Sequence, residues 1–349
     1  MVKAGVPMVS VIAPCRNESR FIENTLNSIL QGDYPADRME LIVVDGMSTD
    51  GTREIVQRMA AKDSRIKLLD NPAQIQAVAM NIGIKASGGD YIIRLDCHST
   101  FVPDYVRKCI EAAKRTGAED VGGYMKTLPG ADTRIANAIA EATSSKFGVG
   151  NSAFRLIGPE REVDTVPFGT FRKELFDKIG LYDERLTRNE DLELSARIRK
   201  RGGRIVISPE IKLSYYNRAT YTGLWQQAFN NALWNPYTIW LVGIGPSLRH
   251  FVPMFFVLGL IAFMTGAFFW LPFKWVFLGY VLLYLFIGSA FAVRCACQRR
   301  VSVFLVLVSF LVLHVAYGLG SLWGVITTPF KFTRRHEKFV GKPLADRKI

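Results

Sequence analysis

Tyr91-Ile92-Ile93-Arg94-Leu95-Asp96-Cys97-His98 is the stretch that decides the fold, because a short apolar run ends there on polar residues. Two earlier apolar runs end in the same way, residues 41–44 at Asp45 and residues 8–13 at Pro14. The segments between these runs have the spacing of amphipathic helices. Alternating strands and helices predict an α/β fold with a largely parallel sheet that is covered by helices.

Three polar loops follow the predicted strands, at residues 15–19, 45–51 and 96–99. Ligands of open α/β sheets bind beyond the carboxyl ends of the strands, so we expect these loops to converge on one site. The first loop contains no glycine, which excludes the Gly-x-Gly-x-x-Gly turn of a dinucleotide site, and no P-loop is present either. Side chains must therefore hold any nucleotide, and Asp45 is the best-placed acceptor for a base or ribose donor.

These strand ends resemble the family-2 glycosyltransferases of the GT-A fold over essentially the whole chain. The motifs that carry the resemblance are residues 9–18, 42–46, 48–52, 81–83, 89–98 and 189–193. The resemblance implies a nucleotide-diphospho-sugar transferase domain with a Rossmann-like mixed sheet, followed by a C-terminal α-helical transmembrane region. Three further motifs are similar to the membrane-anchored branch that includes the succinoglycan-biosynthesis glucosyltransferase, namely residues 121–124, 147–151 and 163–169.

The resemblance also assigns the nucleotide-sugar donor to one group of residues: Pro14, Arg16, Asn17, Glu18, Asp45, Asn81, Arg94 and Asp96. Asp96 and His98 are two residues apart on an extended segment, so their side chains point the same way. A divalent cation beside a departing diphosphate needs such ligands. We expect Mn²⁺ or Mg²⁺, with the imidazole favouring Mn²⁺. The family usually has a second aspartate at this position, and the other interpretation is that His98 only hydrogen-bonds a loop.

An acceptor hydroxyl needs a base within hydrogen-bond reach as it attacks the anomeric carbon. The resemblance gives this role to Asp191, in the first turn of a helix predicted to end at Gly202. Glu190 and Glu193 are alternative bases, and a capping role for Asp191 is the structural alternative. One base and no opposing nucleophile indicate a single displacement with inversion at the anomeric carbon.

Residues 215–234 are rich in aromatic side chains and predict a helix at the membrane interface. Processive family members carry Gln-x-x-Arg-Trp near this point, whereas this chain has Gln227-Ala228-Phe229-Asn230-Asn231. The missing arginine argues against polymer synthesis and predicts the addition of one sugar. Gln227 and Arg218 are therefore expected to act as secondary or acceptor-side residues.

The last part of the chain is apolar and predicts membrane spans. Residues 252–271 and 275–293 contain no charged residue, and residues 301–328 contain only His314. Each run is long enough for one transmembrane helix. We thus expect a catalytic domain at residues 1–235, a transmembrane region at 236–330 with a hinge near 246–249, and a basic tail at 331–349. The five cysteines form no disulfide or zinc pattern, so reduced, structural thiols are expected.

The distribution of charge predicts how the chain is oriented in the membrane, but the basic tail conflicts with that orientation. Residues 251–349 hold 11 of the 44 basic and 2 of the 31 acidic residues, so residues 1–250 carry a net charge of only +4. No signal peptide precedes the first strand, which predicts a multi-pass protein of the cell membrane with a cytoplasmic catalytic domain. Residues 294–300 then lie inside, as the positive-inside rule requires, but a third span would export the basic tail. Either the tail is exported or one segment does not span.

The predicted activity is metal-dependent transfer of one hexose, such as glucose, from a UDP-linked donor to a polyprenyl-linked saccharide in exopolysaccharide or cell-surface glycan synthesis. The expected partners are the donor, the lipid-linked acceptor, the membrane and other enzymes of the pathway, but no nucleic acid. Three alternatives stay open: a polyprenyl-phosphate monosaccharide transferase, a noncatalytic protein that binds sugar nucleotides, and a translocator. The translocator is disfavoured because the three predicted spans contain no charged residue apart from His314, which leaves too few polar groups to line a transport pathway.

Overall fold

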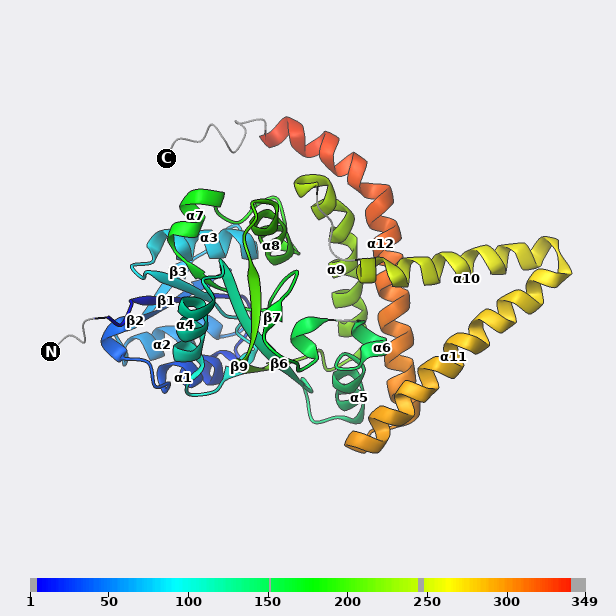
Figure 1. Cartoon of the computed structure of the whole chain (residues 1–349), viewed down its shortest axis with the longest axis horizontal. Coiled ribbons are helices and arrows are strands. Elements are labelled where there is room, and N and C mark those ends of the chain that lie inside the picture. Colours follow the sequence, from blue (N-terminus) through cyan, green and yellow to red (C-terminus); the bar gives the residue numbers. More distant parts are fainter. Residues whose placement is uncertain (1–4, 151, 244–247, 340–349) are drawn as a thin grey trace. The chain divides into compact units, whose positions relative to one another are not determined.

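The computed structural model describes residues 5–150, 152–243 and 248–339, with side chains as far as residue 330. The chain divides into two compact units and changes unit after residues 126, 152 and 216 (Figure 1). The sheet unit ends at residue 126 and resumes from 153 to 216. The helical unit contains residues 127–152 and everything described beyond 216.

The sheet unit is built on one mixed sheet, which within the described residues has nine strands. Their bounds are β1 Val9–Cys15, β2 Met39–Asp45, β3 Ile66–Asp70, β4 Tyr91–Arg94, β5 Ser99–Phe101, β6 Asp120–Leu128, β7 Arg161–Glu162, β8 Thr170–Arg172 and β9 Ile205–Tyr216. The order is β3-β2-β1-β4-β8-β6-β9-β5, and β7 pairs with β9. The first four strands run parallel, whereas β8 is antiparallel to both β4 and β6.

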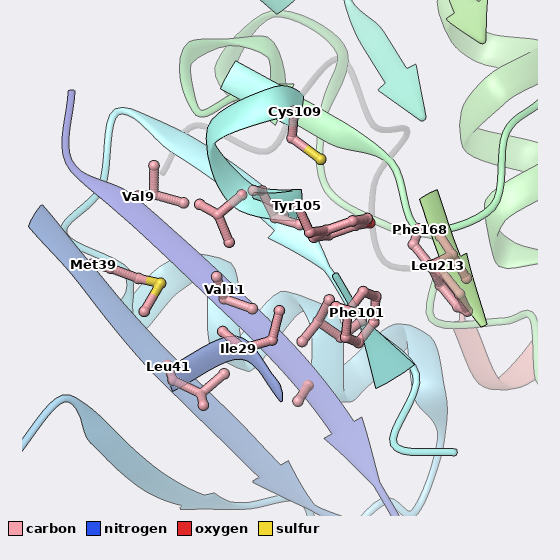
Figure 2. Close-up of a cluster of buried hydrophobic side chains, with 14 of the residues drawn as sticks. Val9, Val11, Ile29, Met39, Leu41, Phe101, Tyr105, Cys109, Phe168 and Leu213 are labelled. Carbon is pink, nitrogen blue, oxygen red and sulfur yellow. The ribbon is translucent and has the colours of Figure 1, made fainter. Parts of the chain in front are cut away.

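Successive residues of the parallel strands point to opposite faces of the sheet and bury a core on each face. Val9, Val11 and Leu41 belong to one cluster, and Ile12 and Ile42 belong to the other. The first cluster also contains residues of α1 Ile22–Leu30, α2 Thr52–Ala60 and α4 Tyr105–Thr116. Figure 2 shows Ile29 of α1 and Tyr105 and Cys109 of α4. The second contains residues of α3 Gln76–Ala86, α7 Glu174–Ile179 and α8 Glu190–Lys200. Helices thus cover both faces, and the predicted α/β mixed sheet is confirmed.

The parallel part of the sheet follows from residue types that favour buried strands. β2 is buried along its whole length, which fits the continuous apolar run at residues 41–44. Helix α3 approaches β1 closely at Gly83, where an added Cβ would lie 2.5 Å from Cγ2 of Ile12. A glycine at this position lets α3 pack tightly on β1.

The helical unit contains three long apolar helices, as predicted. They are α10 Val252–Phe269, α11 Leu271–Arg299 and α12 Val303–Phe339, and each contains a stretch long and apolar enough to cross a bilayer. The same unit contains α5 Arg134–Ala142, α6 Lys146–Val149 and α9 Tyr221–Val242. Helices α9 and α12 lie side by side, and α10 and α11 form a hairpin (Figure 1).

The predicted hinge and the predicted basic tail are only partly covered by the described residues. Pro236 lies inside α9, which continues to Val242 before Gly243 takes a left-handed conformation. The predicted hinge at 246–249 is described only from the short helix at Leu248–Phe251 onward, and residues 340–349 of the predicted tail lie outside the described residues. All five cysteines are free thiols, and Cys297 is the one that is exposed.

Candidate active site

The first two loops are fastened to each other by hydrogen bonds that use backbone groups. Asn17 has a left-handed backbone, its N–H donates to the Ser48 hydroxyl at 2.9 Å, and its side-chain oxygen accepts from the Thr49 N–H at 2.9 Å. The Glu18 N–H donates to the Thr52 hydroxyl at 2.8 Å. A left-handed asparagine is tolerated in a turn because its side chain can bond locally. Asn17 therefore sets the geometry of both loops.

Asp45 ends β2 and is buried beneath these loops. Its carboxylate accepts from the Ser48 hydroxyl at 2.5 Å and from the Ser48 N–H at 3.1 Å, and it lies 3.4 Å from an Arg53 nitrogen. The same Arg53 pairs with Asp70, at the end of β3, at 2.6 Å. A carboxylate held in this way keeps the end of β2 in register with the turn that follows it. Its predicted contact with a base or ribose stays a prediction.

Arg94 lies at the end of β4 and is buried in spite of its charge. Its Nη2 is 3.0 Å from Oε1 of Glu190 and 3.5 Å from Oδ1 of Asp96. Burial alone would lower the pKa of Arg94, but the charges of Asp96, Glu190 and Asp191 raise that pKa well above its usual value. A permanent cation is thus placed between the two acidic motifs, and it connects the end of β4 to the start of α8.

Asp96 and His98 follow Arg94, and each is partly exposed. Oδ1 of Asp96 accepts from Nε2 of Gln76 at 3.3 Å, and Nδ1 of His98 lies 3.0 Å from Oε1 of Glu18. Burial alone would lower the pKa of His98, but the Glu18 hydrogen bond and nearby negative groups raise that pKa to about 10. Without a cation the ring is therefore a charged partner of Glu18.

This arrangement fits a divalent cation. A histidine that binds a metal usually donates its other ring N–H to a carboxylate, which orients the ring. Glu18 takes Nδ1, so Nε2 is the nitrogen that would bind a cation, and Oδ2 of Asp96 is the corresponding oxygen. The described residues contain no group of three metal-binding side chains. The remaining ligands would therefore have to come from the diphosphate and water.

Three acidic residues begin α8, and the structure distinguishes them. Glu190 pairs with Arg94, and Glu193 forms a bidentate pair with Arg197 at 2.9 and 2.6 Å. Burial raises the pKa of Glu190 and of Glu193, and their arginine partners act in the opposite direction. Asp191 is partly exposed, and among the described residues it takes part in no ion pair. Asp191 is thus the acid of this group that remains partly open to solvent, and its role as the base stays a prediction.

Other predicted residues have supporting positions. The amide of Asn81 donates to the Tyr182 carbonyl oxygen and to Glu184, both at 2.9 Å, and accepts from the Tyr182 N–H at 2.9 Å. Asn81 therefore anchors the loop before α8, and its direct contact with a donor stays a prediction. Pro14 is partly buried and Arg16 is exposed, both next to the first loop. Gln227 and Arg218 belong to the helical unit, so their roles also stay predictions.

Two residues of the site were not identified from the sequence. Gln76 contacts Asp96 from the first turn of α3, and Asp120 is buried at the start of β6. Burial and the charge of Asp191 raise the pKa of Asp120 well above its usual value. Gln76 could have been suspected because the first turn of a helix after β3 faces the same sheet edge, whereas no sequence signal marks Asp120.

Comparison with known proteins identifies the family of the chain. The sequence profile described as glycosyl transferase family 2 matches residues 10–180. Succinoglycan biosynthesis protein ExoA of Rhizobium meliloti is 34% identical over 246 residues, which cover 70% of this chain and 74% of that protein. The chain belongs to glycosyl transferase family 2.

Two further similarities extend the comparison. A Methanococcus voltae protein named dolichyl N-acetyl-alpha-D-glucosaminyl phosphate 3-beta-D-2,3-diacetamido-2,3-dideoxy-beta-D-glucuronosyltransferase is 27% identical and covers 61% of this chain and 68% of its own length. The solved mannosyltransferase PcManGT of Pyrobaculum calidifontis, in complex with GDP-Man and Mn²⁺, has a TM-score of 0.64 at 18% identity. That likeness covers 92% of this chain and 88% of the other. The structural likeness supports the GT-A fold of this glycosyltransferase.

Removing the buried guanidinium of Arg94 should destabilise this family-2 enzyme. Arg94→Met leaves Asp96 and Glu190 without their shared partner, so the free energy of unfolding of the sheet unit should fall by about 3–5 kcal/mol. Urea unfolding of the full chain in detergent, followed by fluorescence, measures the change. The control is Arg115→Met, because Arg115 makes a bidentate but exposed pair with Glu160 and should cost only about 0–1 kcal/mol. Equal losses in the two variants would contradict the role of Arg94.

The His98–Glu18 pair should make both the folding stability of the metal-free enzyme and its affinity for Mn²⁺ depend on pH in the alkaline range. Because folding raises the pKa of His98 to about 10, the stability that this pair contributes is complete below the unfolded pKa of about 6.5 and is lost as the pH rises through about 10. Mn²⁺ must displace the Nε2 proton, so its affinity should increase over the same range. Calorimetry between pH 7 and 10 measures this increase.

His98→Asp is the matched variant for this experiment. It keeps a ligand but removes the ring proton, so most of the pH dependence of Mn²⁺ binding should disappear and the preference should move toward Mg²⁺. An unchanged pH profile in His98→Asp would show that His98 is not a ligand.

Proposed function

We propose that this protein is an inverting, metal-dependent hexosyltransferase that moves one sugar from a UDP-linked donor to a lipid-linked saccharide at the cytosolic membrane face. The observation that carries the proposal is the Arg94 bridge. Arg94 pairs with Asp96, a proposed metal ligand, and with Glu190 in the first turn of α8. It therefore links Asp96 to the helix turn that contains Asp191. A transferase needs a group that binds the leaving diphosphate and a base for the attacking hydroxyl, on opposite sides of the reacting carbon.

The donor would lie along the loops that follow β1, β2 and β4. Asn17 and Ser48 hold the first two of these loops together, which supports a nucleotide site that needs little rearrangement when the donor binds. Asp96 and His98 would hold a divalent cation, which neutralises charge that develops on the leaving diphosphate. Glu18 orients His98, and Gln76 together with Arg94 orients Asp96.

Asp191 would accept the proton of the attacking hydroxyl. The positive end of the α8 dipole favours the ionised carboxylate at this position. Glu190 and Glu193 are committed to Arg94 and Arg197, which leaves Asp191 as the base. With one base and no opposing nucleophile, a single displacement inverts the anomeric carbon, and an α-linked donor would give a β-linked product.

The membrane setting and the relatives support a lipid-linked acceptor. The helical unit contains three candidate spans, and the two relatives described above carry names that refer to succinoglycan biosynthesis and to a dolichyl-linked sugar phosphate. The chain lacks the Gln-x-x-Arg-Trp motif at residues 227–231, which supports transfer of one sugar. Exopolysaccharide or cell-surface glycan synthesis is the proposed pathway class.

A donor panel tests the proposed reaction. The full chain in detergent receives UDP-, GDP- or dTDP-hexoses, Mn²⁺ and an extract of polyprenyl-linked saccharides, and mass spectrometry reads the products. The expected result is one added hexose from a UDP donor, with a β-anomeric signal by NMR. A product that consists of a polyprenyl phosphate and one sugar would contradict the proposed acceptor. Nucleotide binding without any transfer would contradict the enzyme assignment.

The base assignment predicts a kinetic separation. Asp191→Asn keeps the size of the side chain but cannot take a proton, so kcat should fall by roughly 10²–10⁴ with little change in donor binding. Glu193→Gln is the control, since its carboxylate pairs with Arg197 and its loss should act on stability more than on kcat. A normal rate in Asp191→Asn with a large loss in Glu193→Gln would transfer the role to Glu193.

A further inference from the structure

The middle of the apolar part of α12 contacts the beginning of α10. A Cβ added to Gly318 would lie 2.3 Å from the carbonyl oxygen of Pro253, and the Tyr317 hydroxyl lies 2.8 Å from Nδ1 of His250. Pro253 is in the first turn of α10, and His250 comes just before that helix. The middle of α12 is therefore at the depth at which the chain enters its first candidate span.

This contact leaves too little of the apolar part of α12 to cross a bilayer. Residues 318 to 330 are 13 residues, which reach about 20 Å at about 1.5 Å per residue. The hydrocarbon core is about 30 Å thick. The sequence then continues with Lys331, Arg334 and Arg335, which are costly to place in hydrocarbon.

The first half of α12 packs on elements that cannot lie across a membrane. Val306 and Phe310 share a buried cluster with Ala138 of α5, and Nε2 of His314 lies 2.9 Å from the Phe147 carbonyl oxygen in α6. Helices α5 and α6 have nine and four residues, far fewer than a span requires. The chain enters their segment from the sheet unit and returns to it. The first half of α12 thus lies on the same side of the membrane as the sheet unit.

Helix α9 covers α12 farther along and is too polar to span. A Cβ on Gly320 would lie 2.3 Å from the Phe229 carbonyl oxygen, and one on Gly324 would lie 2.5 Å from that of Leu233. Around these contacts α9 carries side-chain amides at Gln226, Gln227, Asn230, Asn231 and Asn235. Helix α9 is not among the candidate spans of the described residues. A helix that packs along α9 to Gly324 shares its position outside the hydrocarbon core.

We propose that only the α10–α11 hairpin crosses the membrane and that α12 lies along the cytosolic lipid surface. This inference rests on the cytosolic placement of the catalytic unit in the proposed function. The hairpin carries Trp270, Lys274 and Trp275 at its turn, which suits the far interface. With two crossings, Arg294–Arg300 and the basic tail both stay inside, and the positive-inside rule is obeyed.

The exposed face of α12 fits a lipid surface. Among its residues with described side chains, the large apolar ones that remain exposed are Val303, Phe304, Leu311, Trp323, Val325, Ile326 and Phe330. Basic residues flank the apolar part of the helix in the sequence, at Arg299 and Arg300 before the helix and at Lys331 directly after residue 330. Such residues favour the anionic lipids of the cytoplasmic leaflet. Helices α10 and α11 both contact α12, so the lipid around the proposed membrane hairpin would lie next to this face.

Reporter fusions test the side on which each end lies. GFP, which fluoresces in the cytosol, and alkaline phosphatase, which is active after export, are each fused to the N-terminus and to the C-terminus of the full chain. GFP should fluoresce and the phosphatase should stay inactive at both ends. A cytosolic N-terminus with an exported C-terminus would overturn the inference and leave the proposed function intact. An exported N-terminus would overturn both.

Depth measurements test the orientation of α12 directly. Spin labels on cysteines at Phe304, Leu311 and Val325, all exposed positions of α12, should report one shallow depth in lipid nanodiscs. Labels at Val252, Ile261 and Phe268 of α10 are the matched control and should report shallow, deep and shallow positions. A deep position for Leu311 between two shallow ones would show that α12 spans the bilayer.

Discussion

The buried guanidinium of Arg94 is the constraint on which the catalytic unit depends. A charge removed from water is tolerated only where opposite charges and hydrogen bonds compensate it. Asp96 and Glu190 supply that compensation from two elements that are almost a hundred residues apart in the chain. One side chain therefore holds the end of β4 and the start of α8 together.

The different positions of the acidic residues follow from this constraint. Each carboxylate that binds an arginine is fixed in place and supports its neighbours, as Glu190 and Glu193 do. Asp96, which also pairs with Arg94, and Asp191 are partly exposed, and in the proposed function each would offer an oxygen to a ligand. In the proposed function the site would place a cation-binding side and a proton-accepting side on one frame, which suits transfer between two substrates.

The sequence predicted the parts of the fold that depend on local patterns. Apolar runs at residues 8–13, 41–44 and 91–95 became β1, β2 and β4, and the acidic start of α8 was recognised from its motif. The antiparallel strands β6 and β9 and the contact of Glu18 with His98 depend on packing between distant segments, which no local pattern encodes. The same holds for residues 127–152, which follow β6 in the chain but pack with the long helices.

A structure of the full chain with UDP and Mn²⁺, with anomalous data at the manganese edge, tests the central claim most directly. The account predicts one manganese peak in coordination distance of an Asp96 carboxylate oxygen and Nε2 of His98, with Glu18 still bonded to Nδ1 and Arg94 still paired with Glu190. A manganese peak that contacts neither Asp96 nor His98, or an Arg94 that releases Glu190 when the nucleotide binds, would contradict it.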